Sequence, residues 1–540
     1  MSKQLILGIL LGFVAGGSPF FSASAQPVTN ANGVVVLKLD DYIHQVVAQN
    51  ELVQAQMLEA EVSHRKARGE LGIFEPVLKA SVTREANART NNTEQQAAQG
   101  GASFFSEQNT IYDGGVQELI PLGGTVRLGA NLSSLDNNIN PYGSFLTQTN
   151  NVYIKQYQAF VGVTLNQPLL KDFGLAPTLG SIRLAALDSS IAFQQYRKQM
   201  MLVLSRAESA YWNVYFAQEQ LRFFDDSVAV AQNVLDDSRQ KLSAGQGSEL
   251  DVMDAQSGLA VRQTKRNEAF QSYLEALGMM RSLSGYSPMP DEQGPGGPDI
   301  RVVDLPPQTT APISYADSFW QAYGANPDFL IQQEKMKQEE VRLGVAKSEA
   351  LPELDLKAAY GYNGLGSTPE SAWQVADSQA FPSWTVGVEL TLPLDGNIKA
   401  RNLKKAAQLS LQEAYINLKA AQTEFANHLN TAIHKTQAWE QSVQSYETVV
   451  HYNQELLASA LAQFRAGTVD EHKALEAEAD LLDARQSMAN ALVQYQDALI
   501  EVELADGCIL KKWNLDISRD ELRHETTLLL HDNPEPRMAN

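Results

Sequence analysis

The sequence repeats its own plan, and this internal repeat constrains the fold more than any other feature. Asn50 and Pro76 in the first half match Asn326 and Pro352 in the second half at a shift of 276 residues. The shift later settles at 222 for Gly245/Gly467, Ala255/Ala477, Tyr273/Tyr495, Ala276/Ala498 and Gly285/Gly507. An internal repeat determines the architecture of the whole chain, so a fold assigned without it would be incorrect. The sequence therefore predicts two copies of one structural unit, the first carrying about 50 extra residues between its strands.

Each half is predicted to contain a helix, short strands, a very long helix, a glycine turn and a return helix. The first helices are expected near 40–75 and 315–351, and the very long ones near 180–242 and 397–465. Neither long segment contains a proline, and 63 residues of helix span roughly 95 Å at 1.5 Å per residue. Apolar residues four or seven positions apart suit packing of helix on helix, as in Leu456/Ala460/Phe464 and Leu481/Met488/Leu492.

The segments after the prolines alternate between apolar and polar residues, which is the period of a β-strand. The alternation runs through 125–132, 157–165, 354–362 and 384–392, and Phe160 is the one exception on the polar face of 157–165. A sheet half-buried on a soluble core is the common explanation, but only the helices are available here to cover it. Aromatic residues at the edges of the apolar face favour a membrane β-barrel: Tyr153, Tyr157, Tyr360, Tyr362, Phe381 and Trp384. Each half has too few strands to close a barrel, so we expect one shared between chains.

Composition and the chain ends limit the compartment and the partners. Residues 1–25 have a basic start, a short apolar run and a small-residue cleavage site, which predicts a secretory signal peptide. No stretch is long and apolar enough to predict a transmembrane helix. The formal charge of −21 argues against nucleic-acid binding. A Pro/Gly-rich linker is expected at 286–311 and a polar tail at 508–540, which contains the only cysteine, Cys508.

The sequence lacks the patterns that carry catalysis or bind cofactors and metals. No HExxH, CxxC, P-loop or GxSxG pattern stands in a fitting context. His428 and His434 are six residues apart, which places them on different faces of a helix. We therefore expect no enzyme, no cofactor and no metal site.

The order helix, proline, strands, proline, long helix, glycine turn and helix, repeated after a signal peptide, resembles TolC-type outer-membrane efflux proteins. The local sequence agrees in both halves, as in "VGVTLNQPLLKDFG" with "VGVELTLPLDG" and "AGQGSELDVMDAQ" with "RAGTVDEHKALEAEADLL". The resemblance implies a mainly α fold with a β-barrel portion, built from repeats at 37–285 and 312–507. It also implies a homotrimer that shares one barrel in outer-membrane lipid and continues as a helical tunnel in the periplasm.

The resemblance further implies a passive exit duct of a tripartite efflux or type I secretion system. A periplasmic adaptor and an inner-membrane pump, proton-driven or of the ABC type, would deliver the cargo. The cargo itself, a drug, metal ion, siderophore or protein, is left open. The extra segment 86–157 departs from the simplest family plan, and Pro121–Gly124 looks like a tight turn between two added strands.

In the family, Gly245 and Gly467 would lie at the periplasmic tip, where the paired helices turn. Glycine allows the positive φ that ends a helix, and Ser248 and Asp470 are expected to cap the return helices. Asp251 has two interpretations: a capping-box partner of Ser248, or part of an acidic ring. The candidate ring and gate residues are Asp251, Asp254, Glu476, Asp470, Glu471 and Lys473. Lys473 and Val469 stand where the family pattern has an acidic residue and an arginine, so the ring is expected to be shifted or partly neutralised.

One other class of protein fits part of the pattern. A periplasmic coiled-coil structural or adhesive envelope protein would share the long helices, but it would not need a doubled set of strands with aromatic edges.

Overall fold

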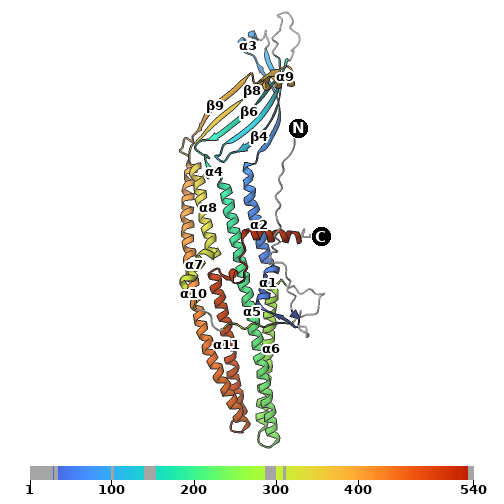
Figure 1. Cartoon of the computed structure of the whole chain (residues 1–540), viewed down its shortest axis with the longest axis vertical. Coiled ribbons are helices and arrows are strands. Elements are labelled where there is room, and N and C mark those ends of the chain that lie inside the picture. Colours follow the sequence, from blue (N-terminus) through green and yellow to red (C-terminus); the bar gives the residue numbers. More distant parts are fainter. Residues whose placement is uncertain are drawn as a thin grey trace, which may run out of the picture. The chain divides into compact units, whose positions relative to one another are not determined.

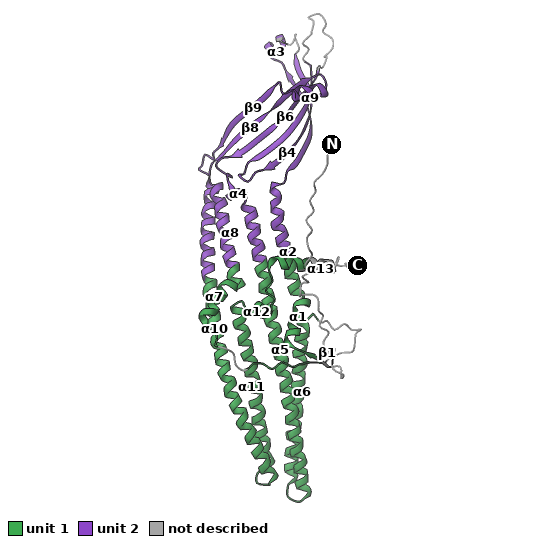
Figure 2. Ribbon diagram, viewed as in Figure 1, with its two compact units in different colours: residues 1–60, 193–330, 420–540 green, residues 61–192, 331–419 purple. Residues whose placement is uncertain are grey.

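The fold is mainly helical and contains one large antiparallel sheet (Figure 1). The computed structural model describes residues 28–29, 34–98, 103–138, 154–285, 299–307 and 312–532. The predicted signal peptide, Tyr153 and parts of the predicted linker lie outside these residues. The chain divides into two compact units (Figure 2). Unit 1 comprises residues 1–60, 193–330 and 420–540, and unit 2 comprises 61–192 and 331–419.

Unit 2 contains a six-stranded sheet in which each strand pairs antiparallel with the next. Its order is β3 (Val77–Thr90), β4 (Phe104–Leu119), β5 (Thr125–Asn137), β6 (Ile154–Pro168), β8 (Glu353–Gly366) and β9 (Pro382–Thr391). The four alternating segments predicted from the sequence are confirmed as β5, β6, β8 and β9. The predicted tight turn is also present, because Ile120 N–H donates to Gly124 O (2.8 Å) and Gly123 has a φ of +89°.

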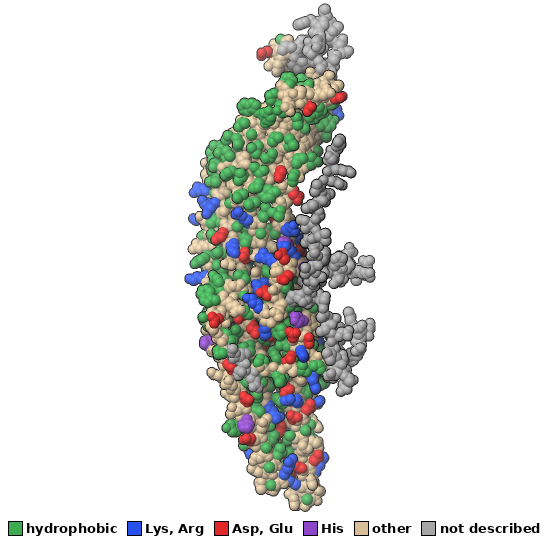
Figure 3. All heavy atoms as spheres, viewed as in Figure 1, with side chains coloured by type: hydrophobic (Ala, Val, Ile, Leu, Met, Phe, Trp, Pro, Cys, Tyr) green, Lys and Arg blue, Asp and Glu red, His purple; other side chains and the backbone are tan. Residues whose placement is uncertain are grey.

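One face of the sheet is apolar and open. The strand register places Leu78, Val116, Leu128, Val163, Tyr360 and Trp384 on this face. Leu78 is 75% exposed and Trp384 is 70% exposed. Figure 3 shows hydrophobic side chains crowded over the strands, whereas acidic and basic side chains lie mostly over the helices. Within the described part of the chain, most of this face is left without a covering layer.

The opposite face is polar and carries ion pairs between strands. Arg127 on β5 pairs with Asp113 on β4, and Lys357 on β8 pairs with Glu389 on β9. Phe160, the apolar exception on this face, covers two glycines. A Cβ on Gly162 or Gly361 would meet the Phe160 Cζ atom at 2.7 or 2.6 Å, so its ring fills space that only glycine leaves free. The exception in the sequence pattern is thus a packing partner for a glycine pair.

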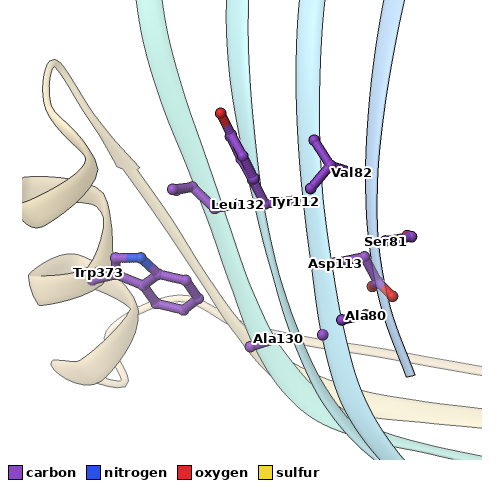
Figure 4. A pocket seen from close by; sticks show the side chains of 9 residues that line it. Ala80, Ser81, Val82, Tyr112, Asp113, Ala130, Leu132 and Trp373 are labelled. Atoms are coloured by element: carbon purple, nitrogen blue, oxygen red, sulfur yellow. The ribbon is translucent and has the colours of Figure 1, made fainter. Parts of the chain in front are cut away.

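A short helix, α9 (Pro369–Asp377), packs on the apolar face at the end of β8. Ala372 and Ala376 of α9 bury Ala159 of β6. The ring of Trp373 points from α9 toward Leu132 and Tyr112, beside an open groove of about 490 Å³ that is lined mainly by small and apolar side chains (Figure 4). Among the described residues of unit 2, this helix covers part of the apolar face. It was not predicted from the sequence.

The long helices occur where they were predicted. The very long ones are α5 (Gly180–Ser243) and α10 (Ile398–Arg465), and the return helices are α6 (Glu249–Leu283) and α11 (Glu471–Ala505). Alternating small and large apolar residues pack these helices in unit 1, for example Val443, Leu492 and Tyr495. Of the predicted apolar positions, Phe464 is buried but Leu456 is 60% exposed in the single chain.

Among the residues that the structure describes, no helix is both long enough and apolar enough to cross a membrane.

The prediction of one continuous first helix in each half is wrong, because both break at an asparagine. The four helices are α1 (Leu39–Gln49), α2 (Glu51–Gly69), α7 (Tyr315–Ala325) and α8 (Pro327–Glu349), and a 3₁₀ turn, η1 (Glu70–Phe74), follows α2. Asn50 Nδ2 donates to the Leu283 carbonyl oxygen (3.1 Å), and Asn326 Nδ2 donates to Ala505 O (3.1 Å). Each asparagine thus ties a first helix to the end of a return helix.

A glycine completes each of these junctions. Gly285 and Gly507 have φ values of +71° and +77°, which favour glycine. A Cβ on Gly285 would lie 3.0 Å from Gln49 O, and one on Gly507 would lie 2.8 Å from the Ala325 carbonyl carbon. The repeat pairs Asn50/Asn326 and Gly285/Gly507 therefore form the same joint twice.

Unit 1 also contains a small sheet that the sequence did not predict. It consists of β1 (Val28–Thr29), β2 (Val34–Leu37) and β7 (Asp299–Val302), and β7 lies inside the predicted linker. Tyr211 of α5 donates to Leu37 O (3.1 Å) and to Asp304 Oδ2 (2.8 Å). Burial and the Asp304 carboxylate raise the pKa of Tyr211, so its hydroxyl remains a donor.

The description of 508–540 as a polar tail is only partly correct. The tail contains α12 (Ile509–Lys512) and α13 (Arg519–Asp532). Ile509 and Leu510 are fully buried, and Lys512 Nζ lies 2.9 Å from the Oε2 of Glu208, which is itself 1% exposed. The tail therefore begins as part of the core of unit 1.

Replacing Asn326 with Ala should lower stability. The change leaves Ala505 O and the Phe329 N–H without the partners that Asn326 supplies, at a cost of about 1–3 kcal/mol. Chemical denaturation followed by circular dichroism measures the effect. Asn267→Ala on the exposed face of α6 is the control and should shift the midpoint little. Equal midpoints for the two variants would contradict the role given to this joint.

Candidate functional site at the paired glycine turns

Two glycine turns with the same geometry connect the long helices to their return helices. At the end of α5, Gly245 N–H donates to Leu242 O (3.0 Å) and Gln246 N–H donates to Lys241 O (2.9 Å). At the end of α10, Gly467 N–H donates to Phe464 O and Thr468 N–H to Gln463 O, both at 3.0 Å. Gly245 and Gly467 have φ values of +74° and +75°. These are the hydrogen bonds of a Schellman motif, which requires a residue in the left-handed region.

The return helices begin with the caps predicted from the sequence. Ser248 Oγ accepts from the Asp251 N–H (3.1 Å), and the Ser248 N–H donates to Asp251 Oδ2 (2.9 Å), which completes a capping box. Asp470 Oδ1 accepts from the Lys473 N–H (3.1 Å). Hydrogen bonds from Ser248 lower the pKa of Asp251, so this carboxylate stays ionised to a lower pH than an ordinary aspartate. The capping interpretation of Asp251 is therefore correct, and the capping carboxylate remains negatively charged.

Acidic residues from both turns gather around Glu471. This side chain is only 8% exposed, although it stands in the first turn of α11. Burial raises its pKa, and the nearby carboxylates of Asp251, Asp470 and Asp254 raise it further. The structure thus brings together four of the predicted acidic residues.

Glu476, in contrast, is neutralised by its own helix. Lys473 Nζ lies 2.7 Å from Glu476 Oε2, three residues away on α11. The hydrogen bond and charge of Lys473 lower the pKa of Glu476, and those of Glu476 raise the pKa of Lys473. The expectation that Lys473 partly neutralises the acidic group therefore applies to Glu476.

Apolar and polar contacts hold the two helix pairs together behind the turns. A buried cluster draws on all four helices: Ala231, Val234, Leu235, Ala255, Leu259, Phe464 and Ala474. Val469, where the family pattern has an arginine, packs against this cluster. Lys241 Nζ donates to Phe464 O (2.7 Å) and lies 3.4 Å from the centre of the Phe464 ring. Lys241 thereby links the end of α5 to the end of α10.

A buried ion pair links the return helices to each other. Arg262 on α6 meets Glu478 on α11 through Nε (2.7 Å) and Nη2 (2.5 Å), with side chains that are 11% and 5% exposed. Arg262 Nη2 also donates to Leu475 O (2.9 Å). Gly258 leaves room for this approach, because a Cβ there would lie 3.0 Å from Leu475 Cδ1. The guanidinium is therefore shared between a carboxylate and a helix carbonyl.

Sequence reasoning found the turns, the caps and the acidic residues but missed these links. A signal for the ion pair was present, since Glu478 interrupts the apolar row Ala474, Leu481 and Ala484 at helical spacing. Within the described ranges, no group of three or more His, Cys, Asp or Glu side chains is arranged to hold a metal ion. The site is thus a group of carboxylates next to a buried apolar cluster.

The model of the family described as "Outer membrane efflux protein" matches residues 321–508, which is most of the second half. Outer membrane protein TolC of Vibrio cholerae is 23% identical over 341 residues, covering 61% of this chain and 72% of that protein. Proteases secretion protein PrtF of Dickeya chrysanthemi is 22% identical over 368 residues, covering 67% and 75%.

The fold is similar to that of solved outer-membrane channels. The CmeC outer membrane channel of Campylobacter jejuni superposes with a TM-score of 0.60 at 15% identity, covering 91% of this chain and 89% of that one. At this identity the likeness concerns the fold.

Replacing Arg262 with Ala should loosen the region behind the turns. The change leaves the Glu478 carboxylate buried without its partner, at a cost of about 3–5 kcal/mol. Hydrogen–deuterium exchange should show faster exchange in α6 and α11 near these residues. Replacing both Arg262 and Glu478 with Leu should restore protection, and Lys473→Ala, which breaks an exposed pair, should change little. Unchanged exchange in Arg262→Ala would contradict the role of this link.

Proposed function

We infer that this chain, which belongs to the outer membrane efflux protein family, is an outer-membrane channel through which substrates leave the cell envelope. The observation that carries this inference is the sheet of unit 2, with one exposed apolar face and one polar face. Such a sheet fits lipid on one side and a water-filled pore on the other. The paired helices fit the periplasmic tunnel of the family.

The chain acts as a passive duct within a larger system. The names of its relatives cover both general outer-membrane channels and protease secretion proteins. We propose that a periplasmic adaptor delivers cargo from an inner-membrane pump, proton-driven or of the ABC type, and that this chain performs no catalysis. It serves either tripartite efflux or type I secretion. A purely structural periplasmic protein would leave the open apolar face of the sheet in water, which disfavours that alternative.

We propose that the working form is a homotrimer built from repeats at 37–285 and 312–507. The apolar face and the exposed apolar residues of the helices, such as Leu456 and Leu250, would then meet lipid or neighbouring copies. A symmetric ring would also place three copies of each glycine turn around one axis.

We further propose that the turn site forms an acidic entrance. Asp251, Asp254 and Asp470 each lie close enough to Glu471 to raise its pKa, so three copies of this group would give a concentrated negative entrance. Glu476 contributes less, because Lys473 neutralises it. This entrance would attract cations and repel anions.

Chemical crosslinking of native membranes should give a ladder that ends at three copies, in the outer-membrane fraction. The physical reason is that an open sheet with an apolar face cannot remain alone in water or lipid. Purified protein should conduct ions in a planar bilayer. A monomer that salt extracts from membranes would contradict the proposed function.

Neutralising the entrance should reduce cation selectivity. A charge at about 4 Å in water contributes roughly 1 kcal/mol, so Asp254→Asn with Glu471→Gln should lower the potassium-to-chloride permeability ratio several-fold. Reversal potentials in a planar bilayer measure this ratio. Glu268→Gln, a neutralised exposed carboxylate farther along α6, is the matched control. Equal ratios for all three proteins would place the selective region elsewhere.

Acidification should reduce the selectivity of the unmodified channel. The pKa of Glu471 is raised above its usual 4.5, so Glu471 loses its charge before Asp251 does as the pH falls. The pKa of Asp251 is lowered, so its charge persists to more acidic pH. Glu471→Gln should therefore remove the step at the higher pH and keep the step at the lower pH. A titration with the same two steps in this variant would contradict the assignment.

A further inference from the structure

The sheet of unit 2 ends in two strands that have a partner on one side only. In the described residues, β3 pairs with β4 and β9 pairs with β8, and neither forms a second ladder. All 14 residues of β3 are exposed, and so are nine of the ten residues of β9. Each edge therefore presents a row of unpaired backbone N–H and C=O groups.

A sheet that faces lipid cannot keep such edges open. No water is present there to satisfy the free N–H and C=O groups, and each unsatisfied group costs several kcal/mol. The edge groups must bond to another strand. Since no described segment of this chain covers them, the partner that fits is a second copy of the chain.

The direction of the strands permits this pairing. Each of the six strands runs antiparallel to its neighbour, so β3 and β9 run in opposite directions. The β3 edge of one copy can thus form a regular antiparallel ladder with the β9 edge of the next. This contact joins two different edges, and such head-to-tail contacts form a closed ring when the rotation between copies closes.

The side chains restrict the register of the new ladder. Leu78 and Val82 lie on the apolar face of β3, and Val386 and Leu390 lie on the apolar face of β9, so even-numbered residues must oppose even-numbered ones. Charged residues further restrict the possible registers of the ladder between β3 and β9. Lys79 lies on the polar face near the start of β3, and Glu389 lies on the polar face near the end of β9. Setting them opposite each other also sets Val82 opposite Val386.

We propose that β3 of one copy pairs with β9 of the next in this register, with Lys79 opposite Glu389 and Thr83 opposite Thr385. This proposal rests on the trimeric channel proposed above. Three copies of a six-stranded sheet then form one ring of eighteen strands. The hairpin of β4 and β5 would then form part of the pore wall.

The extra hairpin has a direct consequence for the pore. Without β4 and β5, each copy would contribute four strands and the ring would have twelve. Because the diameter of a barrel grows roughly linearly with strand number, eighteen strands give a ring about 1.5 times as wide as twelve. The insertion in the first repeat would therefore widen the barrel, and the arrangement of the long helices and return helices would stay the same.

Disulfide crosslinking tests the pairing and its register. Cys508 is the only native cysteine, so Cys508→Ser gives a background without cysteine. Thr83→Cys and Thr385→Cys are then combined in one chain. Within a chain these positions are five strand spacings apart, roughly 24 Å at 4.8 Å per spacing, so a disulfide must join two copies. Oxidation should give covalent dimers and trimers.

A matched control uses the opposite face of the same strand. Val82→Cys with Thr385→Cys places the two thiols on different faces and should give few crosslinks. Crosslinks only between Thr83→Cys and cysteines placed at Ser383 or Gly387 would overturn the register, because these positions lie two residues to either side. Absence of crosslinks at all three positions in an intact, conducting trimer would overturn the pairing and leave the channel function standing. Absence of both trimer and conductance would overturn the channel function as well.

A direct count of strands tests the size of the ring. Electron cryo-microscopy of the purified trimer should show eighteen strands, and deletion of residues 99–153, which removes β4 and β5, should reduce the count to twelve. A twelve-stranded ring in the full-length protein would overturn the proposal. This outcome does not depend on whether the deletion variant folds.

Discussion

The need to pair every backbone N–H and C=O group of the sheet governs the rest of this molecule. A strand in water can leave an edge open at modest cost, but a strand in lipid cannot. The six strands of unit 2 satisfy each other internally and leave the outer edges of β3 and β9. The apolar face adds a second demand, because side chains such as Val386 and Leu390 are more than half exposed in the single chain. In the trimer that we propose, neighbouring copies and lipid would meet both demands.

The two repeats attach their first helices to their return helices by the same contacts. Each half must attach a short first helix to the end of a return helix, and each does so with an asparagine and a glycine. The asparagine carries both donor and acceptor groups, so it caps the second helix while it bonds a carbonyl of the return helix. A change at either joint affects two helices together. This explains why Asn50 and Asn326 stand out in the sequence, although asparagine is a poor residue for a helix interior.

The sequence predicted the elements whose signal is periodic and local. The long helices, the alternating strands, the glycine turns and the caps Ser248 and Asp470 all follow from spacing and from backbone preference. The breaks at Asn50 and Asn326 were missed, although each asparagine caps the helix that follows it and Pro327 directly follows Asn326. The links of Lys241 to Phe464 and of Arg262 to Glu478 join residues more than 200 positions apart. Helix α9 was missed because nine residues are too few for a clear period. The burial of Ile509 and Leu510 depends on docking against unit 1, which no local pattern reveals.

The turn site shows how charge and packing oppose each other in one place. Glu471 is buried beside three other carboxylates, which favours its neutral form and pushes the two turns apart when it is charged. The apolar cluster around Phe464 and the Arg262–Glu478 pair act in the opposite direction, because they join the same helix pairs a few turns away. The ion pair carries no net charge, and it lies behind the carboxylates rather than among them. The ion pair can therefore hold the helices together without cancelling the negative charge at the turns. The charge of Lys473 acts mainly on Glu476, with which it pairs on the same helix, and more weakly on Asp470.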